Sequence, residues 1–162
     1  MKTIFCCILI GIFLPVVSGA LPDDFSDRYA SIAGNDRERL HALFTVWWEE
    51  RLALNPETAT MLGEEKWNDR WSDLSTETIA RQKKNLERPV QSLSKIDRQK
   101  LSPEDQLSFD LFQRTVKLDL EGARFPTELL PLTHMSGVHR TMVETLRLMP
   151  TRSEKDYENV LL

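Results

Sequence analysis

Apolar residues recur at intervals of three and four after residue 35, which is the pattern of an amphipathic helix. Asn35 or Asp36 is a suitable N-cap for this helix. A residue that precedes proline is disfavoured in the helical conformation, so the helix is expected to end near Leu54, ahead of Asn55 and Pro56. The predicted apolar stripe consists of Leu40, Leu43, Phe44, Trp47 and Trp48.

A second, shorter helix is predicted directly after this junction. Asn55 is expected to cap it, with Pro56 at the first helical position, where a missing N–H costs nothing. The helix is expected to cover residues 57–62, and Gly63 is expected to close it in the left-handed conformation. The helical pattern is then lost from Glu64 to Leu74.

A third helix is predicted to begin after Ser75, a good N-cap. Pro89 falls within its apolar pattern, and a proline inside a helix removes a backbone hydrogen bond at a cost of about 3 kcal/mol. A kink or break is therefore expected just before residue 89. The residues expected to point inward are Ile79, Leu86, Val90 and Leu93.

A fourth helix is predicted from Ser102-Pro103, which resembles a capping box with proline at the first position, to Gly122. Its apolar residues cover more than half of its circumference, so it is expected to be the central helix of the fold. These residues are Leu107, Phe109, Leu111, Phe112, Val116 and Leu120.

The remainder of the chain is predicted to be an ordered loop followed by two short helices. Residues 124–139 contain two prolines and a glycine, and the following helix is expected from Thr141 to Met149, closed by Pro150. A capping box at Ser153–Asp156 opens the last element. Its apolar residues, Tyr157, Val160, Leu161 and Leu162, come at the end of the sequence, which is typical of a fragment; the alternative is a terminus that packs on the body.

These patterns predict an all-α fold, an irregular multi-helix array. No segment shows the sustained alternation of apolar and polar residues that a half-buried strand has, and no fold-length repeat occurs.

The first twenty residues are predicted to be a secretory signal peptide. They have a basic start at Lys2, an apolar run from Ile4 to Val17, and small residues ending at Ala20, after which cleavage is expected. The run is shorter than the roughly 20 apolar residues of a spanning helix, although a retained anchor is the alternative. We therefore expect a secreted or periplasmic protein with no stable membrane insertion after cleavage. Residues 21–37 are expected to form a polar lead-in, and residues 38–162 are expected to form the helical part.

The thiols and charges exclude several classes of function. Cys6 and Cys7 lie early in the apolar run, where a lipid-modified cysteine does not occur, and both leave with the signal peptide, so the mature chain has no disulfide, thiolate nucleophile or cysteine ligand. The chain has 25 acidic and 21 basic residues and no basic run. Nucleic acid is therefore not an expected partner.

Two histidines are the candidates for a metal or substrate site. His134 and His139 are five residues apart, which does not place them on one helical face. Glu128 and Glu144 are the only nearby acidic residues that suggest a third ligand, and the alternative is that these histidines only cap or pack. His41 is interpreted as a surface or boundary residue.

Trp67 and Trp71 are the candidates for a ligand-stacking surface, since they stand four residues apart among charged residues. The alternative is that their rings cover the ends of helices with their polar edges in water. Motifs for a serine nucleophile, a dinucleotide loop or a phosphate loop do not occur. Adjacent carboxylates such as Glu49-Glu50 and Glu104-Asp105 are interpreted as solvated or placed near helix N-termini.

Four separated blocks carry a resemblance to a known family. They are LFTVWWEERLALNPETATMLGEEKWNDRWSDLS, SKIDRQKLSPEDQLSFDLF, RFPTELLPLTHMSGVH and LMPTRSEKDYENVL. In this order and spacing, residues 38–162 resemble the amino-terminal part of the bacterial family known as domain of unknown function 885. Pro89 departs from the uninterrupted helix that the family suggests at that position.

The resemblance implies a larger, mainly helical domain similar to zinc metallopeptidases, whose zinc is held by a His-Glu-x-x-His motif far downstream. This motif does not occur here, so no zinc ligand, general base or cofactor is assigned to any residue of the chain, and activity of the chain alone is not expected. The leading hypothesis is an exported N-terminal part that supplies helical scaffold and one wall of a peptide cleft, with the remainder of the polypeptide as its partner. The alternative is a free-standing helical module that binds peptide without catalysis.

Overall fold

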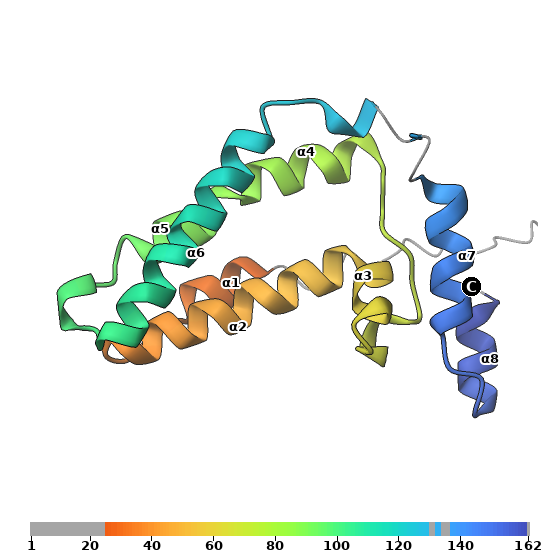
Figure 1. The fold of residues 1–162 in the computed structure, drawn as a ribbon, viewed down its shortest axis with the longest axis horizontal. Coiled ribbons are helices and arrows are strands. Elements are labelled where there is room, and N and C mark those ends of the chain that lie inside the picture. The colour runs from red at the N-terminus through yellow and green to blue at the C-terminus, as the bar shows by residue number, and fades with distance from the viewer. Residues whose placement is uncertain (1–24, 130–131, 134–136, 162) are drawn as a thin grey trace, which may run out of the picture.

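The computed structural model describes residues 25–129, 132–133 and 137–161, so the predicted signal peptide lies outside the described residues. Over these residues the secondary structure is helical, apart from one isolated β-bridge between Leu132 and Gly137. The fold is all-α and irregular, as predicted (Figure 1). None of the described helices is long and apolar enough to cross a bilayer.

The elements follow one another with short connections. In chain order they are α1 (Phe25–Ala30), α2 (Asp36–Leu54), α3 (Pro56–Met61), η1 (Glu65–Trp67), α4 (Thr76–Asn85), α5 (Glu87–Leu93), η2 (Arg98–Lys100), α6 (Pro103–Gly122), η3 (Thr127–Leu129), α7 (Val138–Leu148) and α8 (Glu154–Val160), where η denotes a 3₁₀ helix.

The capping residues of α2 and α3 explain where these two helices meet. Asn35 and Glu38 form a complete capping box at the start of α2, and α2 ends at Leu54 as predicted. Asn55 precedes α3 but does not cap it, because its side-chain amide donates to the Arg51 carbonyl (2.8 Å) instead. Gly63 follows α3 with φ +81°, which confirms the left-handed position.

The helix predicted from Ser75 is divided into α4 and α5. The Ser75 hydroxyl accepts a hydrogen bond from the backbone N–H of Thr78, which confirms the predicted cap. The break falls at Leu86, between the two helices, and Pro89 is a buried residue in the first turn of α5. The proline therefore ends one helix and is accommodated in the next, where its missing N–H has no partner to lose.

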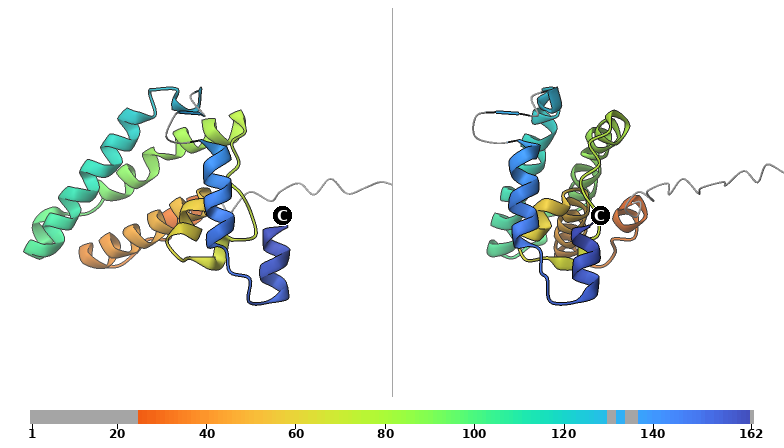
Figure 2. Two further views of the ribbon diagram at one scale, coloured as in Figure 1. Left: turned by 45° about the vertical axis from the view of Figure 1, so that its right-hand side comes forward. Right: turned by 90° about the vertical axis from the view of Figure 1, so that its right-hand side faces the viewer.

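The core lies where α1, α2, α5 and α6 meet, with α1 against α2 and α5, and α5 against α6 (Figures 1 and 2). Part of the predicted polar lead-in thus forms a helix, because Phe25 and Tyr29 of α1 are buried. The buried core cluster consists of Phe25, Tyr29, Leu40, Leu43, Val46, Ala53, Leu93, Ile96, Leu101, Phe109, Phe112 and Val116.

Helix α6 is not the central helix, contrary to the sequence-based expectation. It buries one face through Phe109, Phe112 and Val116, while Leu107 and Leu111 on the opposite side are each more than half exposed. Apolar residues around most of a helix therefore did not indicate burial on all sides here. Trp48, which was included in the predicted apolar stripe of α2, is 45% exposed. Val46, which was not included in that stripe, is buried.

The last two helices lie at one end of the molecule. Helix α7 packs against α3, and Arg152, ahead of α8, pairs with Glu65 of η1 (2.6 Å; Figure 2). Helix α7 begins at Val138, earlier than the predicted Thr141, and the capping box of Ser153 and Asp156 is confirmed. Tyr157 and Leu161 are exposed, and Leu162 lies outside the described residues.

Candidate functional site

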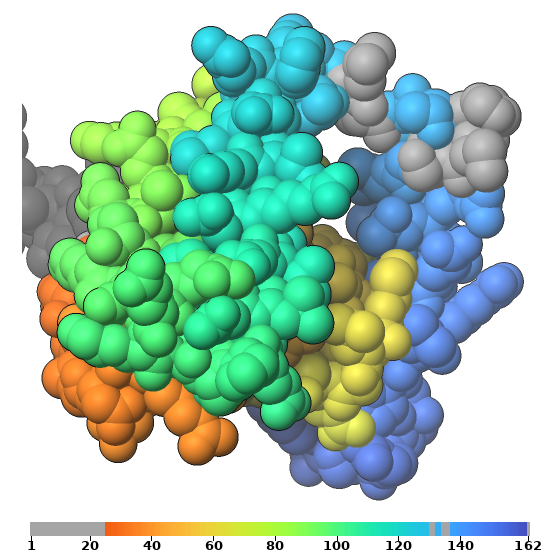
Figure 3. All heavy atoms as spheres, turned by 60° about the vertical axis from the view of Figure 1, so that its left-hand side comes forward, coloured from red at the N-terminus to blue at the C-terminus, as the bar shows by residue number. Residues whose placement is uncertain are grey.

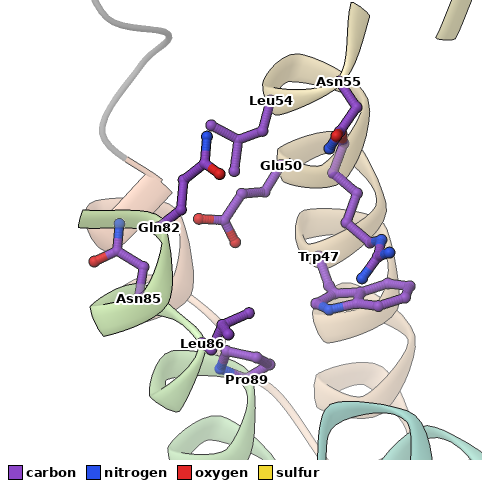
Figure 4. Close-up of a pocket in the computed structure, with 9 residues that line it drawn as sticks. Trp47, Glu50, Leu54, Asn55, Gln82, Asn85, Leu86 and Pro89 are labelled. Carbon is purple, nitrogen blue, oxygen red and sulfur yellow. The ribbon is translucent and has the colours of Figure 1, made fainter. Parts of the chain in front are cut away.

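A pocket of about 150 Å³, here called the inner pocket, lies between α2 on one side and α4 and α5 on the other (Figure 4). Helix α4 diverges from α2 beyond the break at Leu86, which opens this space (Figure 1). The lining residues are Trp47, Glu50, Arg51, Leu54 and Asn55 from α2 and its end, and Gln82, Asn85, Leu86 and Pro89 from the opposite wall.

Glu50 is the acidic residue of the inner pocket, and a buried tyrosine positions it. The Tyr29 hydroxyl donates to Glu50 Oε2 (2.7 Å), which connects α1 to α2. Burial raises the pKa of Tyr29 well above its usual value, and the hydrogen bond to Glu50 raises it further. Tyr29 therefore remains a protonated donor at neutral pH, and Glu50 is held at the pocket wall.

Arg51 is the basic residue of the same pocket, and it is held by two contacts. Its guanidinium lies 4.8 Å from the centre of the Trp47 ring, and Nη1 donates to Asp119 Oδ2 of α6 (2.8 Å). The first contact is a cation–π interaction and the second an ion pair across the space between α2 and α6. Arg51 thus has a fixed position and a charge that Asp119 balances.

A wider cavity of about 550 Å³, here called the outer groove, lies beside the inner pocket. The two share Arg51, Gln82 and Leu86 as lining residues, so they lie next to each other. The outer groove runs between α4 and α6 to η3, and its apolar lining residues are Leu74, Ile79, Leu86, Leu118, Ala123 and Phe125.

An ion pair joins the two sides of the outer groove near η3. Lys83 of α4 donates to Glu128 Oε1 (2.8 Å). This hydrogen bond holds the pKa of Glu128 below its usual range. The lining of the groove therefore combines apolar side chains with two ion pairs, Lys83–Glu128 and Arg51–Asp119.

A second polar cluster links the start of α6 to α2. Asp105 is 6% exposed; it accepts a hydrogen bond from the Ser102 hydroxyl (2.8 Å), lies 2.9 Å from His41 Nε2 and pairs with Arg37. Ser102 bonds to the aspartate and not to the histidine, so the cluster does not have the order of a nucleophilic triad. Its arrangement fixes two helices. Asp105 lies in the first turn of α6, near a helix N-terminus as the sequence suggested, but it is buried and not solvated.

The two histidine candidates are not brought into a metal site among the described residues. His134 lies outside them, and His139 is an exposed residue in the first turn of α7. Glu128 is paired with Lys83, and Glu144 with Arg140 (3.1 Å). Within residues 25–129, 132–133 and 137–161, no group of three or more His, Cys, Asp or Glu residues lies together in a way that could hold a metal ion.

Trp67 and Trp71 belong to the loop that η1 begins. Trp67 packs against the core cluster, and Lys66 Nζ and Arg70 Cζ lie 4.5 Å and 5.5 Å from its ring centre. Trp71 is half-buried. The geometry of Trp67 favours the covering role over the stacking role, because cations of the chain already lie over its ring; a ligand role for either tryptophan stays a prediction.

Of the described candidates from the sequence, Glu128 lines the outer groove, whereas His139, Trp67 and Trp71 line neither the inner pocket nor the outer groove. The residues that line the inner pocket carry no motif, since Glu50 and Gln82 are 32 positions apart and belong to different helices. The helix break that Pro89 predicts was the one local signal of the inner pocket in the sequence, because this break turns α4 away from α2.

A space-filling view shows α6 across the front of the molecule, with α7 and α8 to one side and an open space between α6 and α7 (Figure 3). Helix α6 is therefore exposed on the side away from the core. This agrees with the exposure of Leu107 and Leu111.

Comparison with known proteins identifies the family. The family model described as "Bacterial protein of unknown function (DUF885)" matches residues 56–162. The chain belongs to the DUF885 family. No curated protein and no solved structure matches the chain. The DUF885 match starts at residue 56, later than the expected residue 38, so it includes the α4 and α5 wall of the inner pocket but not Trp47, Glu50 and Arg51 of α2.

Proposed function

We propose that this chain is the exported, non-catalytic helical part of a zinc-peptidase-like protein, and that it supplies one wall of a peptide cleft. The outer groove, which lies next to the inner pocket, is the observation that carries this proposal. It is open and has apolar side chains in its lining, together with the Lys83–Glu128 and Arg51–Asp119 ion pairs. These properties suit an extended peptide, whose side chains fill apolar pockets while a few polar groups fix its position.

Peptide binding by the unmodified chain is the first test. Blocked hexapeptides that contain leucine and phenylalanine are expected to bind, as measured by titration calorimetry. The variant Leu118→Asp places a charge in the outer groove and is expected to weaken binding at least about fivefold, because an unpaired charge at an apolar contact is costly. Leu107→Asp is the matched control, since Leu107 lies on the same helix, is similarly exposed and does not line the groove.

Equal weakening by both variants, or no binding by the unmodified chain, would contradict the proposal. The scaffold role also predicts that the chain alone does not cleave the bound peptides. The nucleotide sequence after codon 162 separates this role from the free-standing peptide-binding module. A reading frame that continues to a His-Glu-x-x-His motif supports the scaffold role, whereas a stop codon there, with peptide binding retained, favours the module.

The export part of the proposal rests on the composition of residues 1–20. In a bacterial host, the exported protein is expected to begin at Leu21, as mass spectrometry of the mature N-terminus would show. Leu9→Arg interrupts the apolar run and is expected to keep the chain in the cytoplasm, whereas Lys2→Arg preserves the basic start and is expected to change nothing. Normal export of the Leu9→Arg variant would argue against a signal peptide.

A further inference from the structure

A third pocket, here called the small pocket, lies where α1, α2 and the end of α5 meet, and its volume is about 50 Å³. It shares no lining residue with the inner pocket or the outer groove. At about 30 Å³ per water molecule in the liquid, it has room for one or two groups of that size. It can therefore hold a water molecule or a small ion, but not a peptide. Its lining includes Tyr29 and Ala30 of α1, Arg39 and Leu43 of α2, and Ser92 and Lys95 at the end of α5.

Arg39 has a hydrogen-bond donor that no described residue satisfies. Its Nη2 donates to Asp36 Oδ1 (2.7 Å), whereas its Nε–H is buried and has no partner within the part of the chain that the structure describes. Buried polar atoms of side chains are nearly always hydrogen-bonded, and a charged group that loses its partner is more costly than a neutral one. The unpaired Nε–H therefore indicates that an acceptor occupies the small pocket.

The charges around the small pocket favour an anion as this acceptor. Arg39 and Lys95 are cations, and none of the described lining residues is acidic. Asp36 balances Arg39 only in part, because Asp36 Oδ1 also accepts from the backbone N–H of Asp97 (2.9 Å). Lys95 is exposed and has no ion pair with any described residue, so its ammonium group is free to turn toward the pocket.

The lining also offers more donors than acceptors. The guanidinium and the ammonium group only donate, and the hydroxyl of Ser92 can donate as well. The hydroxyl of Tyr29 already donates to Glu50 and offers at most a weak acceptor. A buried water molecule needs acceptors for its own hydrogens, whereas a small anion only accepts. The lining thus suits an anion better than it suits water.

We propose that the small pocket binds one monovalent anion of about the size of chloride, which accepts the Nε–H of Arg39 and is balanced by Lys95. The ion contacts residues of α1, α2 and α5, which are three of the four helices that form the core. Its binding therefore stabilises the folded chain. This site is independent of peptide binding, because the small pocket and the peptide groove have separate linings.

Thermal unfolding of the unmodified chain in two sodium salts tests the proposal. Chloride fits the small pocket, whereas gluconate is too large for it. At equal ionic strength, replacing about 0.2 M gluconate by chloride is expected to raise the unfolding temperature by about 3 °C. This is the shift expected for a chain of this length when an ion that binds only the folded state is present at about ten times its dissociation constant. Equal unfolding temperatures in the two salts would overturn the proposal.

Two lysine variants locate the effect. Lys95→Met removes one of the two cations of the pocket and is expected to reduce the chloride effect to about half or less, because the remaining charge attracts the anion more weakly. Lys84→Met is the matched control, since Lys84 is an exposed lysine of α4 that lines none of the three cavities. It is expected to retain the full effect. Equal chloride effects in the two variants would place the ion elsewhere and overturn the assignment.

Arg39→Met removes the unpaired donor and is expected to abolish the chloride effect. It also removes the pair with Asp36, so Lys95→Met decides the outcome if Arg39→Met does not fold. Diffraction from crystals grown in sodium bromide provides a direct second measurement. An anomalous peak is expected within hydrogen-bond distance of Arg39 Nε. A pocket that contains only water in these crystals would contradict an anion site.

Discussion

The Tyr29 hydroxyl donates a 2.7 Å hydrogen bond to Glu50 Oε2, and this bond connects the first described helix to the wall of the inner pocket. Tyr29 is 6% exposed, so its hydroxyl has little access to water. The bond therefore satisfies a buried donor and fixes a carboxylate at the same time. The effect of removing this hydrogen bond and the effect of ionising Tyr29 should both be measurable.

Ionisation of Tyr29 should destabilise the fold at alkaline pH. Its folded-state pKa is raised by burial first and by Glu50 second, above an ordinary value of 10.0. The contribution of this group is fully present below the unfolded pKa of about 10 and is lost as pH rises above it, at up to about 1.4 kcal/mol per pH unit. Tyr29→Phe should lower stability at pH 7 and remove this part of the alkaline loss, as urea unfolding between pH 8 and 11 would measure.

The other tyrosine provides the control for this titration. Tyr157 is more than half exposed. Tyr157→Phe should leave both the stability at pH 7 and the alkaline loss nearly unchanged. An unchanged alkaline loss in Tyr29→Phe would mean that Tyr29 ionises as readily in the folded as in the unfolded chain.

The Arg51–Asp119 pair should contribute little to stability in spite of its 2.8 Å contact. Both side chains are partly exposed, and such pairs typically show coupling energies of about 0.2–1 kcal/mol. A double-mutant cycle with Arg51→Met and Asp119→Asn, followed by urea unfolding, should give a value in this range that decreases in 1 M salt. A coupling of several kcal/mol would indicate that the pair is shielded from water.

Asp105 should account for part of the loss of stability in acid. The hydrogen bond from Ser102, and after it those with His41 and the charge of Arg37, hold the pKa of Asp105 below its ordinary value of 3.8. A lowered folded-state pKa contributes stability that is present above the unfolded pKa, about 3.9, and is lost as pH falls through the folded value. Asp105→Asn should therefore be less stable than the parent at pH 6, with a difference that shrinks below pH 4. A difference that stays constant down to pH 2 would contradict this cause.

The starts of the helices that have a capping side chain could be predicted because they depend on neighbouring residues. Asn35, Ser75, Ser102 and Ser153 all accept the hydrogen bonds expected of N-caps. Such bonds form within three residues, so one stretch of sequence contains both partners. Asn55 is the exception, because the end of α2 competes with the start of α3 for its side chain.

The candidate site could not be predicted because its contacts join distant residues. Glu50 meets Tyr29 from 21 positions away, and Arg51 meets Asp119 from 68 positions away. The sequence presents Glu50 only as an acid beside another acid. Apolar periodicity also overestimated the burial of α6, because it records which faces are apolar and not whether a neighbour covers them.

Core packing should distinguish Leu43 from Leu107 clearly. Leu43 is fully buried in the core cluster, whereas Leu107 is 60% exposed on α6. Leu43→Ala removes buried methyl groups and leaves a cavity, so it should cost about 2–5 kcal/mol of unfolding free energy. Leu107→Ala should stay within about 0.5 kcal/mol of the parent. Similar losses for the two variants in urea unfolding would mean that the outer face of α6 is covered in solution.

Two glycines of the chain should respond to alanine with opposite signs. Gly63 has φ +81° after α3, and Gly122 is the last residue of α6; a Cβ added at either position meets nothing within 4 Å. Only backbone conformation then separates them. Gly63→Ala should destabilise by about 1 kcal/mol, because the left-handed conformation is strained for residues with a side chain. Gly122→Ala should stabilise by about 0.5 kcal/mol, because alanine has less backbone entropy to lose in a helix. Thermal unfolding of both variants and of the parent would measure these changes in stability. A neutral Gly63→Ala would show that the backbone at residue 63 does not adopt the left-handed conformation in solution. The loop that contains Trp67 and Trp71 would then lack the turn that directs it back along α3.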